Sequence, residues 1–192
     1  MHLPVVIDFE TKYTFREFSD PKKLEISVAG AYNYATGELK AFTEDQLPDL
    51  FKWLENASCI IGFNIIDFDL PVLQAYYPGD VATFPVFDIM ADVKTILGRR
   101  LSLDSLVKAT LNTQKSGHGL LAVEYFKQGK MEELSAYCKD DVDLTRQLFE
   151  YGIDNKEIWY LSPQGKSRLS VSWAKYMKEK DRLDDRSLTL PF

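Results

Sequence analysis

A short apolar segment near the N-terminus, which ends in two carboxylates, most constrains how this chain can fold. Residues 3–10 read Leu-Pro-Val-Val-Ile-Asp-Phe-Glu, a pattern typical of a buried strand. Pro4 fits only at the start of that strand, because proline cannot donate to a strand ladder. Alternate side chains of a strand share one face, so Asp8 and Glu10 point the same way. Unpaired carboxylates are costly to bury, and the pair is therefore predicted to share a divalent cation.

The rest of the chain alternates between strand patterns and helix patterns. Thr43 and Gln46 have the spacing of a capping box, and Asp88 is placed to cap another helix. The order predicts an α/β fold: a mixed sheet, formed by an antiparallel three-strand meander plus parallel strands, with helices on both faces. We expect the further strands near 24–34, 39–42, 58–63 and 84–87, and helices near 43–54, 68–76, 88–97, 102–111, 120–127 and 131–151, the last ended by Gly152.

A second group of polar residues follows the apolar segment 58–63. Asn64 and Asp69 lie near the C-terminal end of that predicted strand. If it neighbours the first strand, they converge on the first acidic pair, and the next helix aims its N-terminal amides at the same place, which suits a phosphate. Asp67 and Asp69 compete for the ligand role. The other would cap the helix, and we assign the cap to Asp67.

A third motif lies on the last long helix. Tyr137 and Asp141 are four residues apart and so share a helix face, whereas Asp140 points elsewhere and is expected to be solvated. A Tyr/Asp pair at this spacing is common by itself. Its place after the two other acidic motifs gives it weight.

In this order the three motifs resemble those of the DEDD exonucleases, in the tyrosine branch of the DnaQ-like, ribonuclease-H-like superfamily. The likeness spans about residues 4–152. Residues 61–71 are similar to the proofreading domain of B-family DNA polymerases, and residues 101–106 resemble stand-alone predicted exonucleases of bacteria. The assignment to the tyrosine branch rests on Tyr137, since the sister branch would have histidine where this chain has Ala136.

The resemblance implies a 3′–5′ exonuclease that releases nucleoside 5′-monophosphates with two divalent ions, Mg²⁺ or Mn²⁺. One ion would be held by Asp8, Glu10 and Asp141, and the other by Asp8 with Asp69. Tyr137 would orient the attacking water. The implied catalytic set is Asp8, Glu10, Asp69, Tyr137 and Asp141, and the implied substrate-binding set is Phe9, Thr11 and Asn64. Phe9 fits a core position equally well, and Asn64 would contact the substrate strand or brace the loop of its own motif.

Charge alone does not favour a nucleic-acid binder, because the net charge is −6 and the pI about 5.0. Bound metal ions would reverse the local field. Residues 153–192 carry a slight excess of basic residues and are expected to form a hairpin and a short helix, an appendage packed on or extending from the core of a 1–152 exonuclease domain. A basic surface in this tail would either bind the phosphate backbone of a nucleic acid or be a solvated face of the protein. We favour the solvated face. The candidate residues for this basic surface are Lys166, Arg168, Lys175 and Lys178. Lys115 and His118 are further candidates that would line the path of the nucleic-acid strand.

The remaining expectations concern compartment, partners and alternatives. The two cysteines, Cys59 and Cys138, have no metal-type spacing and suit a reduced cytoplasmic protein, and neither a membrane span nor a secretory signal is expected. The expected partner is a nucleic acid with a single-stranded 3′ end, more readily DNA, with a helicase or polymerase as a possible further partner and the oligomeric state left open. The alternatives are a silent nucleic-acid-binding or scaffold module, an exoribonuclease that trims RNA 3′ ends, and internal cleavage.

Overall fold

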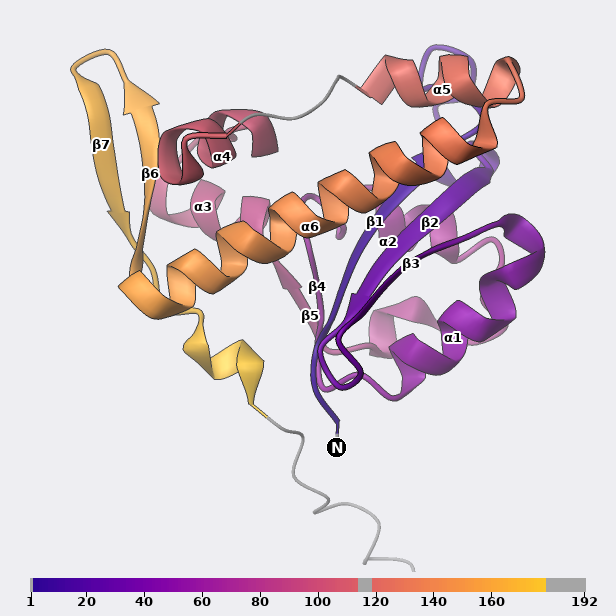
Figure 1. Ribbon diagram of the computed structural model, residues 1–192, viewed down its shortest axis with the longest axis horizontal. Coiled ribbons are helices and arrows are strands. Elements are labelled where there is room, and N and C mark those ends of the chain that lie inside the picture. Colours follow the sequence, from indigo (N-terminus) through magenta and orange to yellow (C-terminus); the bar gives the residue numbers. More distant parts are fainter. Residues whose placement is uncertain (1, 114–118, 179–192) are drawn as a thin grey trace, which may run out of the picture.

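The predicted mixed sheet is confirmed in the computed structural model, which describes residues 2–113 and 119–178. The sheet has five strands in the order β3-β2-β1-β4-β5 (Figure 1). The first three strands along the chain form an antiparallel meander, while β4 and β5 run parallel to β1. The strands are β1 (Val5–Thr11), β2 (Ile26–Asn33), β3 (Glu38–Phe42), β4 (Ile60–Gly62) and β5 (Val86–Asp88).

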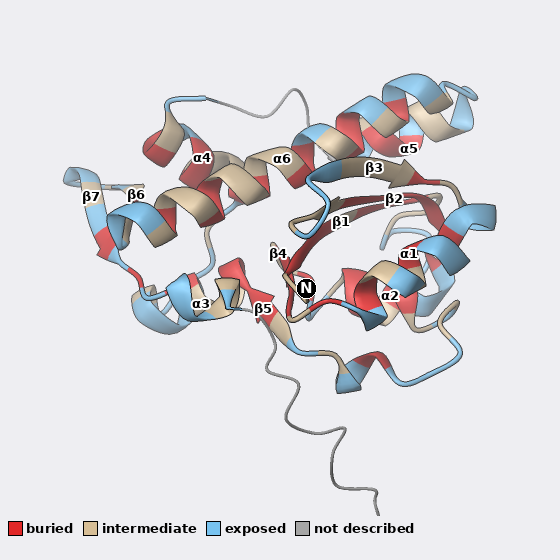
Figure 2. Ribbon diagram, turned by 60° about the horizontal axis from the view of Figure 1, so that its bottom comes forward, coloured by how far each residue is buried: buried red, intermediate tan, exposed pale blue. Residues whose placement is uncertain are grey.

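Helices cover both faces of this sheet, as Figure 2 shows. The helices α1 (Leu47–Glu55) and α2 (Asp69–Leu73) pack on one face, and the long α6 (Met131–Asn155) crosses the other, with α5 (Gly119–Lys127) at its N-terminal end. On the α6 face, α3 (Ile89–Leu97) and α4 (Leu103–Leu111) share a core with α6. Short 3₁₀ helices lie at Pro21–Lys23, Glu44–Gln46, Val81–Thr83 and Ala174–Met177. Within residues 2–113 and 119–178, the helices are too short or too polar to span a bilayer.

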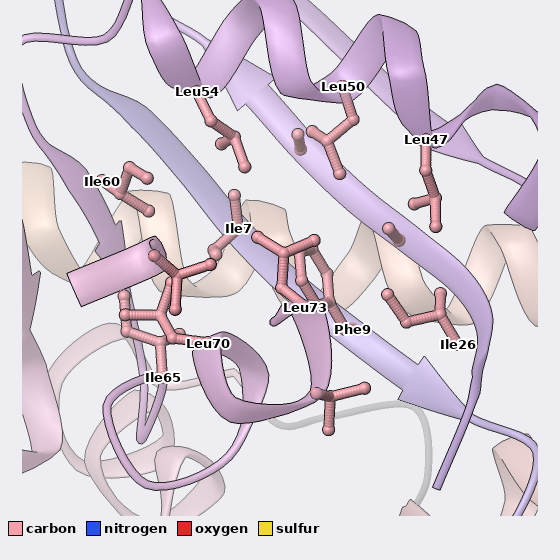
Figure 3. Packing of buried hydrophobic residues seen from close by; sticks show 14 of the residues in the cluster. Ile7, Phe9, Ile26, Leu47, Leu50, Leu54, Ile60, Ile65, Leu70 and Leu73 are labelled. Atoms are coloured by element: carbon pink, nitrogen blue, oxygen red, sulfur yellow. The ribbon is translucent and has the colours of Figure 1, made fainter. Parts of the chain in front are cut away.

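The side chains of β1 alternate between the two faces. Ile7 and Phe9 enter the core beneath α1 and α2, where they lie near Leu50 and Leu73 (Figure 3). Val6 belongs to the other core, on the α6 side. The strand period therefore places even-numbered side chains of β1 toward α6 and odd-numbered ones away from it.

The predicted end of the last long helix at Gly152 is wrong, because α6 continues to Asn155 and Lys156 takes the left-handed conformation. Gly152 lies inside the helix for a packing reason. A Cβ there would come within 2.3 Å of the Trp173 indole, so the absence of a side chain lets the later segment approach α6 closely. The predicted hairpin follows, formed by β6 (Glu157–Ser162) and β7 (Gly165–Ser170).

Trp173 fixes the segment after the hairpin to the main core. Its indole is 1% exposed, stacks on Phe149, and donates a hydrogen bond to the Asp92 carboxylate at 2.8 Å. Tyr176 stacks on Phe87 with ring centroids 4.0 Å apart. The described part of 153–192 therefore shares the core of the first 152 residues.

Candidate active site

Three carboxylates meet where the C-terminal part of β1 faces α6. One oxygen from each of Asp8, Glu10 and Asp141 lies within 4.8 Å of the other two. Asp8 and Glu10 share a face of β1 for the reason that the sequence predicted, and Asp141 comes from α6. Asp141 is 2% exposed and Glu10 9%. Such crowding of like charges is unfavourable unless a cation or protons offset it.

Gly30 explains how α6 can come so close to the sheet. It pairs with Asp8 across β1 and β2, and a Cβ at this position would lie 2.7 Å from Val142 and 2.8 Å from the Cys138 sulfur. The space that it leaves open is filled by α6. The Cys138 thiol donates a hydrogen bond to the backbone oxygen of Asp8 at 3.2 Å, which ties the helix to the strand beside the acidic group.

Asp69 lines the same cavity but is not one of the three clustered carboxylates. It stands in the first turn of α2 and accepts a hydrogen bond from the backbone N–H of Phe9 at 2.8 Å. Burial raises the pKa of Asp69 to about 7, and the charge of Asp88 adds to this, while the Phe9 N–H opposes it. The carboxyl is therefore poised between its charged and neutral forms near neutral pH.

Asp67 faces away from this group. It is exposed and forms an ion pair with Arg100. The cap that we assigned to Asp67 is wrong, because α2 begins at Asp69 and its N-cap position is Phe68. Of the two aspartates that compete for the ligand role, Asp69 lines the cavity and Asp67 does not.

Asp88 has a second role beyond the predicted helix cap. It caps α3 through the backbone N–H groups of Met90 and Ala91. It also accepts hydrogen bonds from the N–H groups of Asn64, at 2.9 Å, and Ile66, at 3.0 Å, in the loop that leads to Asp69. The side chain therefore fixes this loop. The neighbouring C-terminal ends of two parallel strands were the sequence signal that could have indicated it.

Tyr137 lines the cavity and is 4% exposed. Burial raises the pKa of its phenol, and the negative charges of Asp141, Glu10 and Asp8 raise it further. The hydroxyl consequently keeps its proton at neutral pH and can donate a hydrogen bond, but it cannot act as a base there.

The cavity has a volume of about 420 Å³ and an apolar as well as an acidic wall. Phe15 is 53% exposed, and its ring lies 5.8 Å from that of Phe68. Sequence reasoning missed this wall, because Phe15 lies in an irregular segment whose side chains follow no period. Its members are Tyr13, Phe15, Leu24, Phe63, Phe68, Leu120 and Val123.

The predicted substrate-binding residues fall into different surroundings. Phe9 is among the residues that line the cavity, but its side chain is 2% exposed and packs in the core, so the stacking hypothesis for its ring is not supported. The alternation that brings Asp8 and Glu10 together turns Phe9 to the opposite face. Thr11 lines the cavity, with its hydroxyl donating to the backbone oxygen of Tyr13 at 2.8 Å, whereas Asn64 braces the loop through its N–H and does not line the cavity. Lys115 and His118 lie outside the described residues.

The donor set fits hard divalent cations. Asp8, Glu10 and Asp141 offer only carboxylate oxygens, the ligands that Mg²⁺ and Mn²⁺ prefer. Two of them are nearly fully buried, where a cation would offset their repulsion. The cavity beside them leaves room for a substrate and water.

A ribonuclease-H-like α/β sheet with an acidic cluster at the end of its central strand is an arrangement that suits a nuclease. The sequence profile of a family described as 3′–5′ exonuclease matches residues 2–151, most of the chain. The chain therefore belongs to the 3′–5′ exonuclease family, and with its fold it is a DEDD exonuclease of the ribonuclease-H-like superfamily.

One solved structure with a similar fold is the family B DNA polymerase from the hyperthermophilic archaeon Pyrobaculum calidifontis. Its TM-score is 0.61 at 17% sequence identity, over 80% of this chain. The chain covers only 25% of that polymerase, and at this identity the likeness shows the fold alone. No curated protein matches this sequence.

Proposed function

We propose that this protein removes nucleotides from the 3′ end of single-stranded DNA and releases nucleoside 5′-monophosphates, with two divalent ions, Mg²⁺ or Mn²⁺. The observation that carries the proposal is the meeting of Asp8, Glu10 and Asp141 in one cavity, from a strand and a distant helix. Membership of the exonuclease family supports the class of reaction. The proposed metal ligands are these three residues and Asp69.

The bound ions and the side chains of the site have separate roles. When bound, the divalent ions supply a more acidic water and stabilise charge on the leaving oxygen. The protonated hydroxyl of Tyr137 orients the attacking water by a hydrogen bond, the role expected of this residue in the tyrosine branch. The exposed ring of Phe15, backed by Phe68, offers a stacking surface to an unpaired base.

Substrates labelled at either end test the proposal. Single-stranded DNA and RNA of the same sequence are incubated with the protein and Mg²⁺, Mn²⁺ or EDTA. We expect mononucleotides from the 3′ end of DNA with either metal and none with EDTA. Faster release from RNA would favour the exoribonuclease. Binding without cleavage in every metal would favour the silent module.

Two variants of α6 make the test specific to the acidic group. Asp141→Asn removes a metal ligand at nearly constant volume and should abolish activity while the thermal transition is retained. Asp140→Asn removes the same charge one residue away on the exposed side of the helix and should leave activity unchanged. Equal activity in the two variants would contradict the proposed role of Asp141.

A further inference from the structure

A second cavity, of about 560 Å³, lies between the C-terminal end of α4 and the β6–β7 hairpin. It is larger than the acidic cavity, and its wall has the opposite charge, with two ammonium groups and no carboxylate. Neither lysine forms an ion pair within the described part of the chain. We call it the hairpin groove, and it is lined by Lys108, Ala109, Asn112, Thr113, Leu161 and Lys166.

The hairpin groove has a fixed shape because α4 is bonded to the edge of β6. The Thr110 hydroxyl donates to the backbone oxygen of Trp159 at 3.1 Å and accepts from its N–H at 3.0 Å. Thr110 is nearly fully buried, so this double contact joins helix and hairpin firmly. The two lysines, which come from different elements, are therefore held on opposite sides of one groove.

The exposed face of the hairpin beside the groove combines apolar and cationic side chains. The Lys166 ammonium lies 5.2 Å from the centre of the Trp159 ring, and Leu161, which pairs with Lys166 across the strands, is 55% exposed. Arg168 pairs with Trp159 across the strands and is exposed as well, and its guanidinium forms an ion pair with Glu157 at 3.4 Å. Cations next to an aromatic ring on an open face suit a phosphate backbone with unpaired bases.

We propose that the hairpin groove binds the phosphodiester backbone of the single-stranded substrate, on the 5′ side of the bond that is cleaved. The proposal rests on the proposed function. Charge complementarity selects this occupant, because the chain is acidic overall while this groove has two lysines without a partner carboxylate. Strand binding here would also offset the repulsion between a polyanion and an acidic protein.

The two cavities share no lining residue and lie in different parts of the molecule. Asp141 stands at the acidic cavity, and the same helix ends at Asn155, next to the hairpin (Figure 1). At 1.5 Å per residue, this part of α6 measures ~21 Å. A stacked strand advances ~3.4 Å per nucleotide, and the groove residues Leu161 and Lys166 lie beyond Asn155, at the turn end of the hairpin, so a strand of several nucleotides is needed to connect the cleaved bond with the groove. Shorter substrates should not reach it.

The test uses the full chain with the double substitution Lys108→Gln and Lys166→Gln. With Mg²⁺, we expect the KM for a DNA of roughly fifteen nucleotides to rise about tenfold, while kcat and all parameters for one of about four nucleotides stay unchanged. Each lysine should account for ~0.7 in the slope of log affinity against log salt, so the slope should fall by ~1.4. The control double variant, Lys52→Gln and Lys94→Gln, removes the same charge from exposed positions on α1 and α3 and should behave as wild type.

Binding without metal separates this proposal from the proposed function. In EDTA, the affinity of the long DNA is measured by fluorescence anisotropy for all three proteins, after their thermal transitions are shown to agree. Weaker binding by the groove variant alone supports the proposal even if no protein cleaves DNA. Equal binding by all three overturns it. If the groove variant loses affinity for polyglutamate and not for DNA, the occupant is an acidic protein segment and the proposal is also overturned.

Discussion

Asp69 is the residue whose burial has the clearest consequence for stability. The pKa of Asp69 is about 7 in the folded protein, well above the value of an exposed aspartate. Between about pH 4 and pH 7 the unfolded chain therefore binds fewer protons than the folded one. The sign follows directly: Asp69 favours folding most at low pH, and this contribution is lost as the pH rises toward 7.

Replacement of Asp69 by asparagine should remove this dependence. The amide oxygen can still accept from the Phe9 N–H, but it carries no charge to bury. In EDTA, we expect the Tm of Asp69→Asn minus that of wild type to increase from pH 5 to pH 8, as measured by differential scanning calorimetry. A difference that stays constant with pH would show that Asp69 is ionised throughout this range.

The raised pKa of Tyr137 makes a different prediction, one for catalysis. Because the phenol stays protonated, Tyr137→Phe removes a hydrogen-bond donor and not a base. We expect kcat to fall roughly tenfold to a hundredfold, less than on removal of a metal ligand, with KM and the thermal transition unchanged. Single-turnover rates measure the effect. Wild-type turnover in this variant would remove Tyr137 from the mechanism.

Prediction from the sequence succeeded for side chains whose position depends only on the two-residue period of a strand. The alternation of β1 was enough to place Asp8 and Glu10 together. The same rule, applied to Phe9, would have placed its ring in the core, where the structure has it. Phe15 could not be located in this way, because it lies in an irregular segment that places it beside Phe68 only after folding.

At the scale of elements, the contact between α6 and β2 decides whether the acidic group forms. Gly30 permits that contact, and Gly152 permits the equivalent approach of Trp173 at the other end of α6. The two glycines provide a matched pair. Both leave no room for a Cβ, yet only Gly30 lies beside the carboxylates.

Gly30→Ala and Gly152→Ala should each lower the free energy of unfolding by ~1–3 kcal/mol, the usual cost of overpacking. Their activities should differ. Gly30→Ala moves α6 away from Asp8 and should lose most activity per folded molecule, whereas Gly152→Ala should retain it. Urea denaturation and exonuclease rates at low temperature give both quantities. Full activity in Gly30→Ala would mean that the spacing of the site tolerates a shift of α6.

The elements themselves were predictable to different degrees. The strands and long helices were expected from hydrophobic period, and the segment around Thr43 from its capping pattern, with the Gln46 side chain accepting from the Thr43 N–H at 3.2 Å. The helix expected over 68–76 is shorter, Asp69–Leu73. The helix end predicted at Gly152 was wrong because glycine often ends a helix through its conformational freedom. Here Gly152 instead allows close packing against Trp173, which is distant in the sequence. Only tertiary contact could reveal that.

At the scale of the whole molecule, the chain separates opposite charges into two cavities. The acidic cavity is lined by Tyr137 and Asp141 of α6, whereas the hairpin groove is lined by residues of α4, the segment after it and the β6–β7 hairpin. The net charge of the chain sums over both cavities, so the basic hairpin groove cannot be recognised from it. The sequence predicted a slightly basic final segment but could not place Lys166 opposite Lys108, because that proximity depends on how α4 packs against β6.

The final segment, which we predicted to pack on or extend from the core of a 1–152 domain, shares a core with that part of the chain. Ile158, Leu169 and Trp173 are buried with Phe87 and Phe149 from the earlier part of the chain. A unit that folds independently would share few contacts with the rest of the chain. A chain cut after residue 152 would expose this apolar surface, so we expect it to be much less stable than the full chain.

Trp173→Ala tests this coupling without truncation. It should lower the free energy of unfolding by ~3–5 kcal/mol, because it removes a large buried side chain and leaves a cavity beside Gly152. Leu161→Ala, at an exposed position of the hairpin, should change it by less than ~0.5 kcal/mol. Urea denaturation should show one transition for each protein. If Trp173→Ala were as stable as wild type, or unfolded in two steps, the final segment would be a separate appendage, and the core of residues 1–152 would have to stabilise the acidic site alone.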